Sequence, residues 1–540
     1  MSQMLKSTGA MGFATFTSRL LGLVREQVYA NFMGDTPVAS AFKLAFQVPN
    51  LFRRLLGEGA LTAAFIPIFK EKEKTAGEVE MWRAANAVAS GLVVAVAVLV
   101  GVVVLGISLF LAASSARFTK AGLAVFPAFP FPILQDDTRL MLELLRIMFP
   151  YLLLVCLAAL CMGILNARGH FFIPAMGATM LNVVMIATVL LLAPRFGVAM
   201  ETQIFALAIG VLAAGFAQFV FQLPTLWGEG FRYHWVRPWD DETVRKVVRR
   251  MLPAAVGVGA FQLNVLLIQG MSFWVDRTIV ASFDYAVRLM EFPQGIVGIS
   301  LATYLLSALS SLAASKDYSG FRLTLREGLG HLIFVNLLAS VILFVLAEPI
   351  IRLLFERGAF TNASTARATM ALACLAPGLV AFSTVNVLAR AFFALGDTRT
   401  PMKISVVCLI INLVIAAWLI GPFRQGGLGV ANTLSSLVNV WLLLHALRRK
   451  LTRLDLGPLR PVLLSLLGAT ALSGTIAWGI LRLWETRMGH STLPARLGAV
   501  FLPMLAAAVV YWGLALWMRV PQAREIGGLI LKRFGRRGQD

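Results

Sequence analysis

The sequence has little charge and few cysteines for its length. Only 14% of its 540 residues are charged, against roughly a quarter in soluble globular chains. Its four cysteines, Cys156, Cys161, Cys374 and Cys408, lie in apolar stretches without a CxxC pair or a Cys/His cluster, which argues against a disulfide framework and a zinc site. The motifs GxGxxG and GxxxxGK[ST] are also missing, which disfavours ATP-driven transport by this chain.

Long apolar stretches are what the sequence has instead. Hydrophobic residues make up 58% of the chain, and residues 88–112 contain no charge at all. Stretches of 18 or more apolar residues are long enough to cross a hydrocarbon layer of ~30 Å. We therefore predict an all-α polytopic membrane protein with fourteen transmembrane helices. The predicted spans are 8–32, 39–69, 84–112, 140–166, 172–194, 202–227, 251–275, 279–313, 324–347, 367–395, 402–421, 427–447, 460–483 and 493–518.

The distribution of basic residues predicts which way the chain is oriented. A net charge of +21 would suggest a nucleic-acid partner in a soluble protein, but here the cations lie mostly in short loops between spans. About 28 Lys and Arg fall on the side of the termini and about 12 on the other, which is the positive-inside bias. We predict a multi-pass protein of the cell inner membrane with both termini cytoplasmic and no nucleic-acid partner.

Two sequence echoes indicate an internal repeat. "NARGHFFIPAMGATMLN" (166–182) and "ALGDTRTPMKISVVCLIIN" (394–412) each place Gly before a polar turn, Pro five residues later and then an apolar run ending in Asn. "AFKLAFQVPN" (41–50) and "YAVRLMEFPQ" (285–294) form the second echo. Transporters are often built from such repeats. We predict two pseudo-symmetric six-helix lobes, 1–228 and 229–450, followed by two C-terminal helices and a basic cytoplasmic tail in 451–540.

The most informative anomaly is charge at membrane depth. The predicted spans contain six cations: Arg19, Arg25, Lys43, Arg53, Arg54 and Arg288. The acids in the same spans are Glu26, Glu58, Asp284 and Glu291. Six cations facing lipid would cost roughly 15–20 kcal/mol, so they must pair with acids or face water.

Helical spacing predicts part of the pairing. Asp284, Arg288 and Glu291 are spaced i, i+4 and i+7 and share one stripe, and Lys43 and Arg54 share a face unless Pro49 rotates it. One interpretation is that all these groups form salt bridges that lock helices together. The other is that six cations against four acids leave positive charge that a pyrophosphate or carboxylate ligand neutralises.

Several blocks resemble the MurJ (MviN) family of lipid II flippases, within the multidrug/oligosaccharidyl-lipid/polysaccharide (MOP) exporter superfamily. They are "SRLLGLVREQVYANFMG" (18–34), "PNLFRRLLGEGALTAAFIPIF" (49–69), "RLMEFPQGIVGISLATYLLSALS" (288–310) and "ALGDTRTP" (394–401). The resemblance implies two lobes around a central cationic cavity, and a transporter rather than an enzyme. Its substrate would be lipid II, flipped to the periplasmic leaflet for peptidoglycan synthesis, cell wall biogenesis and cell shape.

The resemblance also implies which residues line the cavity. The family's essential arginines match Arg19, Arg25, Arg53 and Arg288, and Glu26 stands where Asp is more usual. Two further positions depart from the family pattern, because Ser40 and Val287 stand where relatives often carry Asp. Asp284, one turn before Arg288, is the candidate replacement.

The predicted mechanism is alternating access, with lipid II and membrane lipids as partners and a monomeric protein. We expect no cofactor. Coupling to the membrane potential or to a sodium ion stays open, with Asn264, Asn386 and Asn412 as candidate sodium ligands. The alternatives are a flippase for another lipid-linked oligosaccharide, an ion-coupled drug exporter, and a membrane enzyme acting on polyprenyl phosphates; no acid cluster that could hold magnesium supports the enzyme.

Overall fold

Helices are the regular secondary structure in the residues that the structure describes. A computed structural model describes residues 2–55, 60–114, 135–451, 457–525 and 527–528, and these contain no strand. They divide into two compact units, Met1–Ala281 and Ser282–Asp540. The all-α class predicted from the apolar stretches is therefore confirmed for the described residues.

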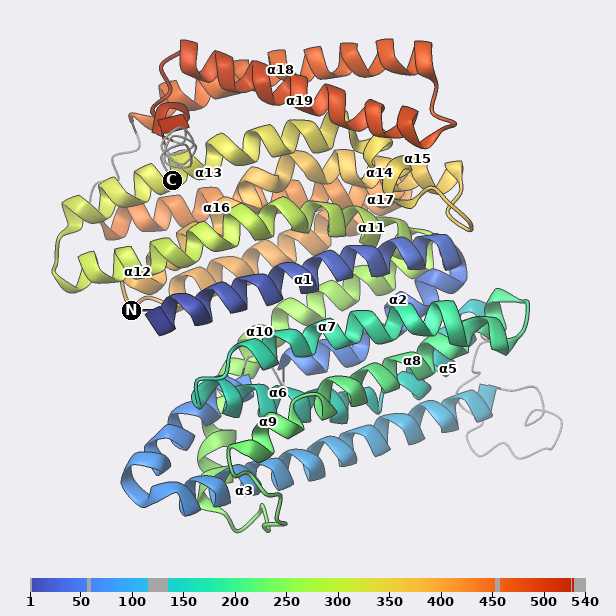
Figure 1. The fold of residues 1–540 in the computed structure, drawn as a ribbon, viewed down its shortest axis with the longest axis vertical. Helices are drawn as coiled ribbons and strands as arrows, with labels where there is room; N and C mark the ends of the chain where they lie inside the picture. The colour runs from blue at the N-terminus through green and yellow to red at the C-terminus, as the bar shows by residue number, and fades with distance from the viewer. Residues whose placement is uncertain (1, 56–59, 115–134, 452–456, 526, 529–540) are drawn as a thin grey trace. The chain divides into compact units, whose positions relative to one another are not determined.

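Figure 1 shows the α-helices that the structure describes in the first unit. Its helices are α1 (Ser2–Met33), α2 (Pro37–Phe52), α3 (Ala60–Ser114), α5 (Asp136–Met148), α6 (Tyr151–Ala167), α7 (Phe172–Ala187), α8 (Met200–Val220), α9 (Leu223–Gly228) and α10 (Glu242–Val275). Helix α1 packs against α7, α2 against α5, and α3 against α6 and α10. Since α10 packs on α2 and α3, the compact unit reaches beyond residue 228; the predicted lobe boundaries stay predictions.

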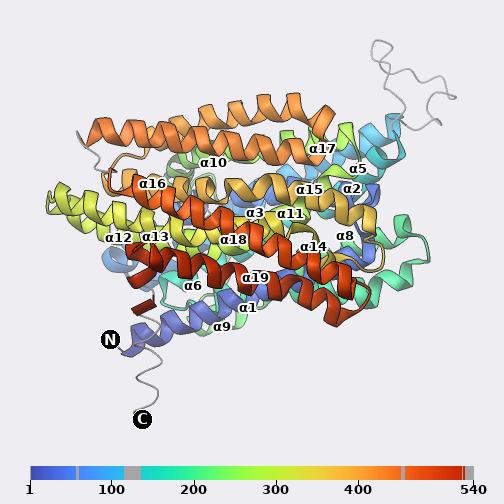
Figure 2. The same cartoon turned by 90° about the horizontal axis from the view of Figure 1, so that it is seen from above.

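The second unit starts within α11 (Ile279–Pro293) and ends with a helical hairpin. It contains α12 (Ser300–Ala314), α13 (Tyr318–Val345), α14 (Ala347–Phe355), α15 (Asn362–Leu375), α16 (Leu379–Ala394), α17 (Arg399–Lys450), α18 (Leu459–Met488) and α19 (Leu493–Trp517). Helices α18 and α19 run side by side (Figure 2) and pack on α13. The buried hydroxyl of Tyr511 donates to the Phe334 carbonyl at 2.8 Å, which satisfies the polar end of an otherwise apolar contact.

Helix α17 is a hairpin rather than one rod. Its 52 residues would measure about 78 Å if straight, more than twice the hydrocarbon thickness. The backbone leaves helical geometry at Arg424 (φ 46°, ψ −127°). Ser435 Oγ then donates to the Cys408 carbonyl at 2.8 Å across 27 residues, so the two arms lie against each other. The arms correspond to the predicted spans 402–421 and 427–447.

The helix lengths test the predicted number of membrane crossings only in part. Eight stretches of the described helices are long and apolar enough to cross a membrane, or nine if the bent pair α5–α6 counts as one span. Helix α3 is one of the eight, although it breaks at Gly77 (φ 82°), and α17 is another. The fourteen crossings therefore stay a prediction.

The two sequence echoes adopt matching local structures. Gly169 ends α6 with φ 92° and Gly396 ends α16 with φ 73°, the left-handed conformation that glycine adopts without strain. In each case the next amide closes the helix by a bond to the carbonyl five residues back: His170 to Leu165 at 2.8 Å, and Asp397 to Phe392 at 3.0 Å.

The second echo shares a proline followed by a wide turn. Pro49 lies inside α2, and residues 53–55 are π-helical; Pro293 ends α11, and the π-helix Gln294–Ile299 follows. A proline removes one backbone donor, which favours such a local change of helical pitch. In both echoes, therefore, the segment of the first unit and the segment of the second unit have the same kind of local structure.

Candidate functional site

Helices α1 and α2 bring two cations to one buried carboxylate. Glu26 has a side chain only 4% exposed; Arg25 Nη2 lies 2.6 Å from its Oε1, and Lys43 Nζ lies 3.6 Å from its Oε2. The Arg25 guanidinium also lies 5.4 Å from the centre of the Tyr29 ring, within cation–π range. Thr36 caps α2 by accepting from Ala39 N, and Pro37 starts the helix, so Lys43 is set two turns into it. This Arg25–Glu26–Lys43 cluster has two formal positive charges and one negative.

The neighbouring predicted site residues are spread along the same two helices. Arg53 Nε donates to Asn50 Oδ1 at 2.9 Å, in the π-helical turn that follows α2. Lys43 and Arg54 would share a face only if the helix between them kept its regular pitch, and the π-helical turn changes that pitch. Arg54 is exposed, whereas the Lys43 side chain is 9% exposed. Arg19 is exposed. Glu58 lies outside the described residues.

The Asp284–Arg288–Glu291 stripe forms in the second unit. Arg288 lies 3.9 Å from Asp284 and 3.1 Å from Glu291, as the i+4 and i+7 spacing predicted. The exposed fractions of the Arg288 and Glu291 side chains are 41% and 52%. The protein therefore does not enclose these two side chains, and the stripe is not a buried salt-bridge cluster.

The two positions that depart from the family pattern have different surroundings. Ser40 is fully buried, and its Oγ accepts from Ala281 N at 3.1 Å, near the start of α11. A carboxylate there would accept the same bond, so serine keeps the contact without the charge. Val287 is half-buried beside Arg288, and Asp284 reaches Arg288 from one turn away.

The loops at one end of the first unit meet around Arg168. It lies 2.7 Å from Glu73, 3.2 Å from Glu78 and 2.7 Å from Glu229, while His170 Nε2 lies 2.7 Å from the other oxygen of Glu229. Hydrogen bonds from His170 and then Arg168 hold the pKa of Glu229 below its ordinary value of 4.5. The Arg168 cluster therefore joins the loops after α6 and α9 to the bend of α3.

Acid should weaken the Arg168 cluster. Because the folded pKa of Glu229 is depressed, its stabilising contribution is complete above pH 4.5 and is lost as the pH falls below 4.5 through the folded value. We expect the melting temperature of purified wild type to exceed that of Glu229→Gln at pH 7, and the difference to shrink below pH 4.5. Thermal melts of both proteins in one detergent from pH 7 to pH 3 measure this; a difference that stays constant contradicts it.

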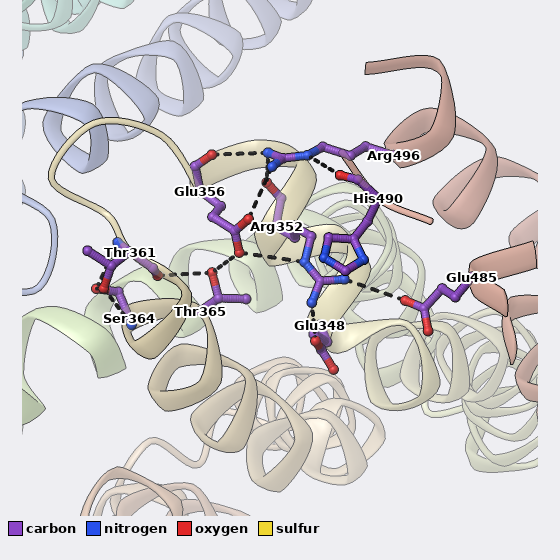
Figure 3. Close-up of polar contacts among 9 residues, drawn as sticks. All are labelled: Glu348, Arg352, Glu356, Thr361, Ser364, Thr365, Glu485, His490 and Arg496. Carbon is purple, nitrogen blue, oxygen red and sulfur yellow. Dashed lines mark hydrogen bonds and ion pairs between the residues drawn. The ribbon is translucent and has the colours of Figure 1, made fainter. Parts of the chain in front are cut away.

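The second unit contains an ion cluster around Arg352 (Figure 3), which the sequence analysis did not predict. Arg352, on α14, has a side chain 8% exposed and contacts Glu348, Glu356 at 3.5 Å and Glu485 at 3.5 Å. Arg496, on α19, lies 3.1 Å from Glu356. This Arg352 cluster ties α14 to both arms of the α18–α19 hairpin. The i, i+4, i+8 spacing of Glu348, Arg352 and Glu356 is the sequence signal that could have found it.

The ion pairs described between loops of the same unit join loops that are predicted to lie on the same side of the membrane. In the first unit, the Arg168 cluster connects three loops predicted cytoplasmic, whereas Arg277 contacts Asp137 at 3.6 Å between two predicted periplasmic ones. In the second unit, Lys450 lies 2.7 Å from Asp397 between predicted cytoplasmic loops. The Arg352 cluster connects predicted periplasmic loops. The alternation of the predicted spans is consistent with each of these contacts.

The candidate sodium ligands differ in their hydrogen-bond partners, and their role stays a prediction. Asn264 belongs to the first unit, and Asn386 Nδ2 donates to Phe382 O in its own helix at 3.2 Å. Asn412 Nδ2 donates to Asn432 Oδ1 at 3.3 Å across the α17 hairpin. Among the described residues, no group of three or more His, Cys, Asp or Glu side chains could hold a metal ion.

Comparison with solved structures identifies the class of fold. The chain is similar to an inward-facing multidrug resistance MATE family transporter of the MOP superfamily (TM-score 0.63, 13% identity, 81% of this chain and 94% of that one). It is also similar to a structure described as lipid II flippase MurJ in an inward closed conformation (TM-score 0.72, 21% identity, 94% and 98%). These likenesses define a multi-pass helical protein with the fold of a membrane transporter.

Sequence comparison identifies the family. The family model described as "Lipid II flippase MurJ" matches residues 29–498. The probable lipid II flippase MurJ of Vibrio cholerae is 35% identical over 451 residues, covering 82% of this chain and 83% of that protein. The lipid II flippase MurJ of Burkholderia cenocepacia is 30% identical over 509 residues, covering 93% and 95%. The chain belongs to the MurJ family, as its sequence blocks indicated.

Proposed function

We propose that this protein flips lipid II, the undecaprenyl-pyrophosphate-linked peptidoglycan precursor, from the cytoplasmic to the periplasmic leaflet of the inner membrane. The observation that carries the proposal is the family match over residues 29–498, which contains Lys43 and Arg288 and begins three residues after Glu26. The protein is a transporter and performs no covalent chemistry on its substrate. It needs no bound cofactor and acts as a monomer.

The cations of the first unit are proposed to bind the pyrophosphate. A guanidinium donates two parallel hydrogen bonds to a phosphate, and an ammonium adds a compact charge. Glu26 holds Arg25 and Lys43 close together, which limits the mutual repulsion of the two cations while the site is empty. Arg19, Arg53 and Arg54 extend the positive charge along α1 and beyond α2, and Arg288 belongs to the same proposed set with Asp284 and Glu291.

Transport is proposed to follow alternating access. The pyrophosphate enters a cationic site that is open to the cytoplasm, the polyprenyl tail stays in lipid, and the protein then opens to the periplasm. Each charge moved through 100 mV is worth ~2.3 kcal/mol. With the cytoplasm negative, the outward movement of the anionic headgroup and the inward return of an empty cationic site are both favoured.

The proposed topology has fourteen crossings and both termini in the cytoplasm. The same-side loop contacts support the alternation of the crossings, and the excess of Lys and Arg on one side supports the orientation. The helical hairpin of α17 supports two crossings within its 52 residues.

The decisive experiment is flipping of purified lipid II by the purified protein in vesicles. We expect transfer of lipid II that depends on the protein, and slower transfer when the potential is collapsed. In parallel, the gene should rescue cells depleted of their own lipid II flippase. Transfer of a different lipid-linked oligosaccharide but not of lipid II would reject the proposed substrate, and unchanged transfer without a potential would reject the proposed coupling.

A further inference from the structure

The segment between α9 and α10 is bound along one side of α3. Asn86, on α3, donates through Nδ2 to the Arg232 carbonyl at 3.0 Å and accepts through Oδ1 from His234 N at 3.1 Å. One turn further along α3, Ser90 Oγ accepts from Val236 N at 3.3 Å and lies 3.2 Å from the Tyr233 hydroxyl. Two polar side chains of α3 therefore hold residues 231–239, which we call the strap and which form neither helix nor strand.

The strap lies where α3 enters its apolar stretch. Asn86 and Ser90 stand at the start of the uncharged residues 88–112, and four residues of helix span about 6 Å. Gly91 approaches Pro238 and Val244 so closely that a Cβ added there would lie 3.3 Å from each. Irregular backbone at the edge of a bilayer needs internal hydrogen-bond partners, and Asn86 and Ser90 supply three of them. This placement puts the strap at the boundary between hydrocarbon and water.

The outward side of the strap is aromatic. Tyr233, Trp235 and Trp239 have exposed fractions of 49%, 54% and 61%. Large aromatic side chains are rarely left this exposed by a protein that faces only water, whereas Trp and Tyr are enriched at the headgroup level of membranes.

Helix α10 begins directly after the strap and presents a basic face. Arg245, Lys246, Arg249 and Arg250 are all exposed and fall within about 140° of the helix circumference, given 100° per residue. Thr243 and Val247 are buried on the other side, where α10 packs against α3. Across residues 231–250 there are six Lys and Arg against three acids. Of those acids, Asp241 caps α10 and Glu242 pairs with Lys246 at 2.8 Å.

We propose that the strap and the basic face of α10 form a binding site for the headgroups of anionic phospholipids. The aromatic rings insert at the depth of the headgroups while the cations contact the phosphates. Anionic headgroups suit this surface because the positive charge and the exposed aromatics lie on consecutive residues at one membrane boundary. A site for an acidic protein would not need its aromatics at the depth where α3 becomes apolar. The inference concerns structural lipid and does not depend on the substrate proposed above.

The test uses quenching of tryptophan fluorescence by brominated lipids. The full-length protein is placed in phosphatidylcholine vesicles that contain a small fraction of brominated phosphatidylglycerol or the same fraction of brominated phosphatidylcholine. The strap contribution is the difference between wild type and Trp235→Phe/Trp239→Phe. We expect phosphatidylglycerol to quench this contribution at least about two-fold more than phosphatidylcholine at low salt, since each cation near the surface favours anionic lipid.

A matched pair of variants assigns the preference to this site. Arg249→Gln/Arg250→Gln should reduce the preference for phosphatidylglycerol and leave quenching by phosphatidylcholine unchanged. Arg448→Gln/Arg449→Gln removes two exposed charges from the end of α17 and should change neither. Equal quenching by both lipids in wild type, or equal effects of the two double variants, would overturn the anionic-lipid site. No quenching of the strap contribution by either lipid would show that water or a protein partner covers it.

Discussion

Arg25→Ala should abolish rescue of flippase-depleted cells and reduce lipid II transfer in vesicles to the background level. Arg25 supplies forked donors at the Glu26 carboxylate, and the ammonium group of Lys43 beside it has no such fork. Its removal also leaves Glu26, whose side chain is 4% exposed, with one cation fewer. Removing one partner of a buried ion pair costs about 3–5 kcal/mol, so the single variant alone cannot separate transport from stability.

A second variant separates the two effects. Arg25→Ala/Glu26→Gln removes both the cation and its buried partner, and should recover most of the lost thermal stability while transfer stays at background. Arg25→Lys keeps the charge without the fork and should bind lipid II more weakly while it folds normally. If the double variant regains transfer together with stability, Arg25 is a structural residue and its proposed role in binding is wrong.

Arg352→Met should strongly destabilise the second unit. Methionine has a similar length and no charge, so the variant removes the shared partner of Glu348, Glu356 and Glu485 while it keeps much of the apolar packing. Because Arg352 is 8% exposed and Glu356 is 15% exposed, we expect a loss of about 3–5 kcal/mol. The α18–α19 hairpin should loosen first, because two of its residues belong to the Arg352 cluster.

The control is Arg357, the next arginine along the chain. The side chain of Arg357 is exposed, and its described hydrogen bond goes to Leu353 O, one turn earlier. Arg357→Met should therefore change the melting temperature little. Hydrogen exchange measured by mass spectrometry reports the hairpin directly: faster exchange in α18 and α19 of Arg352→Met but not of Arg357→Met is the expected result. Equal exchange in both variants would contradict a role for the Arg352 cluster in holding the hairpin.

Local patterns in the sequence predicted those features whose causes lie within one helix or turn. The stripe of Asp284, Arg288 and Glu291 follows from 3.6 residues per turn alone. The matching glycine turns at Gly169 and Gly396 follow from the echoed motif, because a left-handed residue at a helix end favours glycine. The apolar stretches likewise predicted the all-α class, since backbone groups in lipid must bond within their own segment.

Pairings between helices could not be predicted in this way. Seven-residue spacing places Arg19 and Glu26 on one stripe of α1, yet Glu26 contacts its neighbour Arg25 and, from α2, Lys43, while Arg19 is exposed. The strap is a similar case: Asn86 lies 146 residues before Arg232, and nothing in either segment specifies the other.

The sequence by itself determined that this chain crosses a membrane many times, belongs to the MurJ family and has cations within its predicted spans. Those properties depend on composition, on spacing and on sequence blocks, which are all local. Only the tertiary structure decided which carboxylate each cation meets, how α14 is tied to the α18–α19 hairpin and where the strap lies on α3. Ion pairs and hydrogen bonds act over a few ångströms, so their partners are defined only after helices that are distant in sequence have packed together.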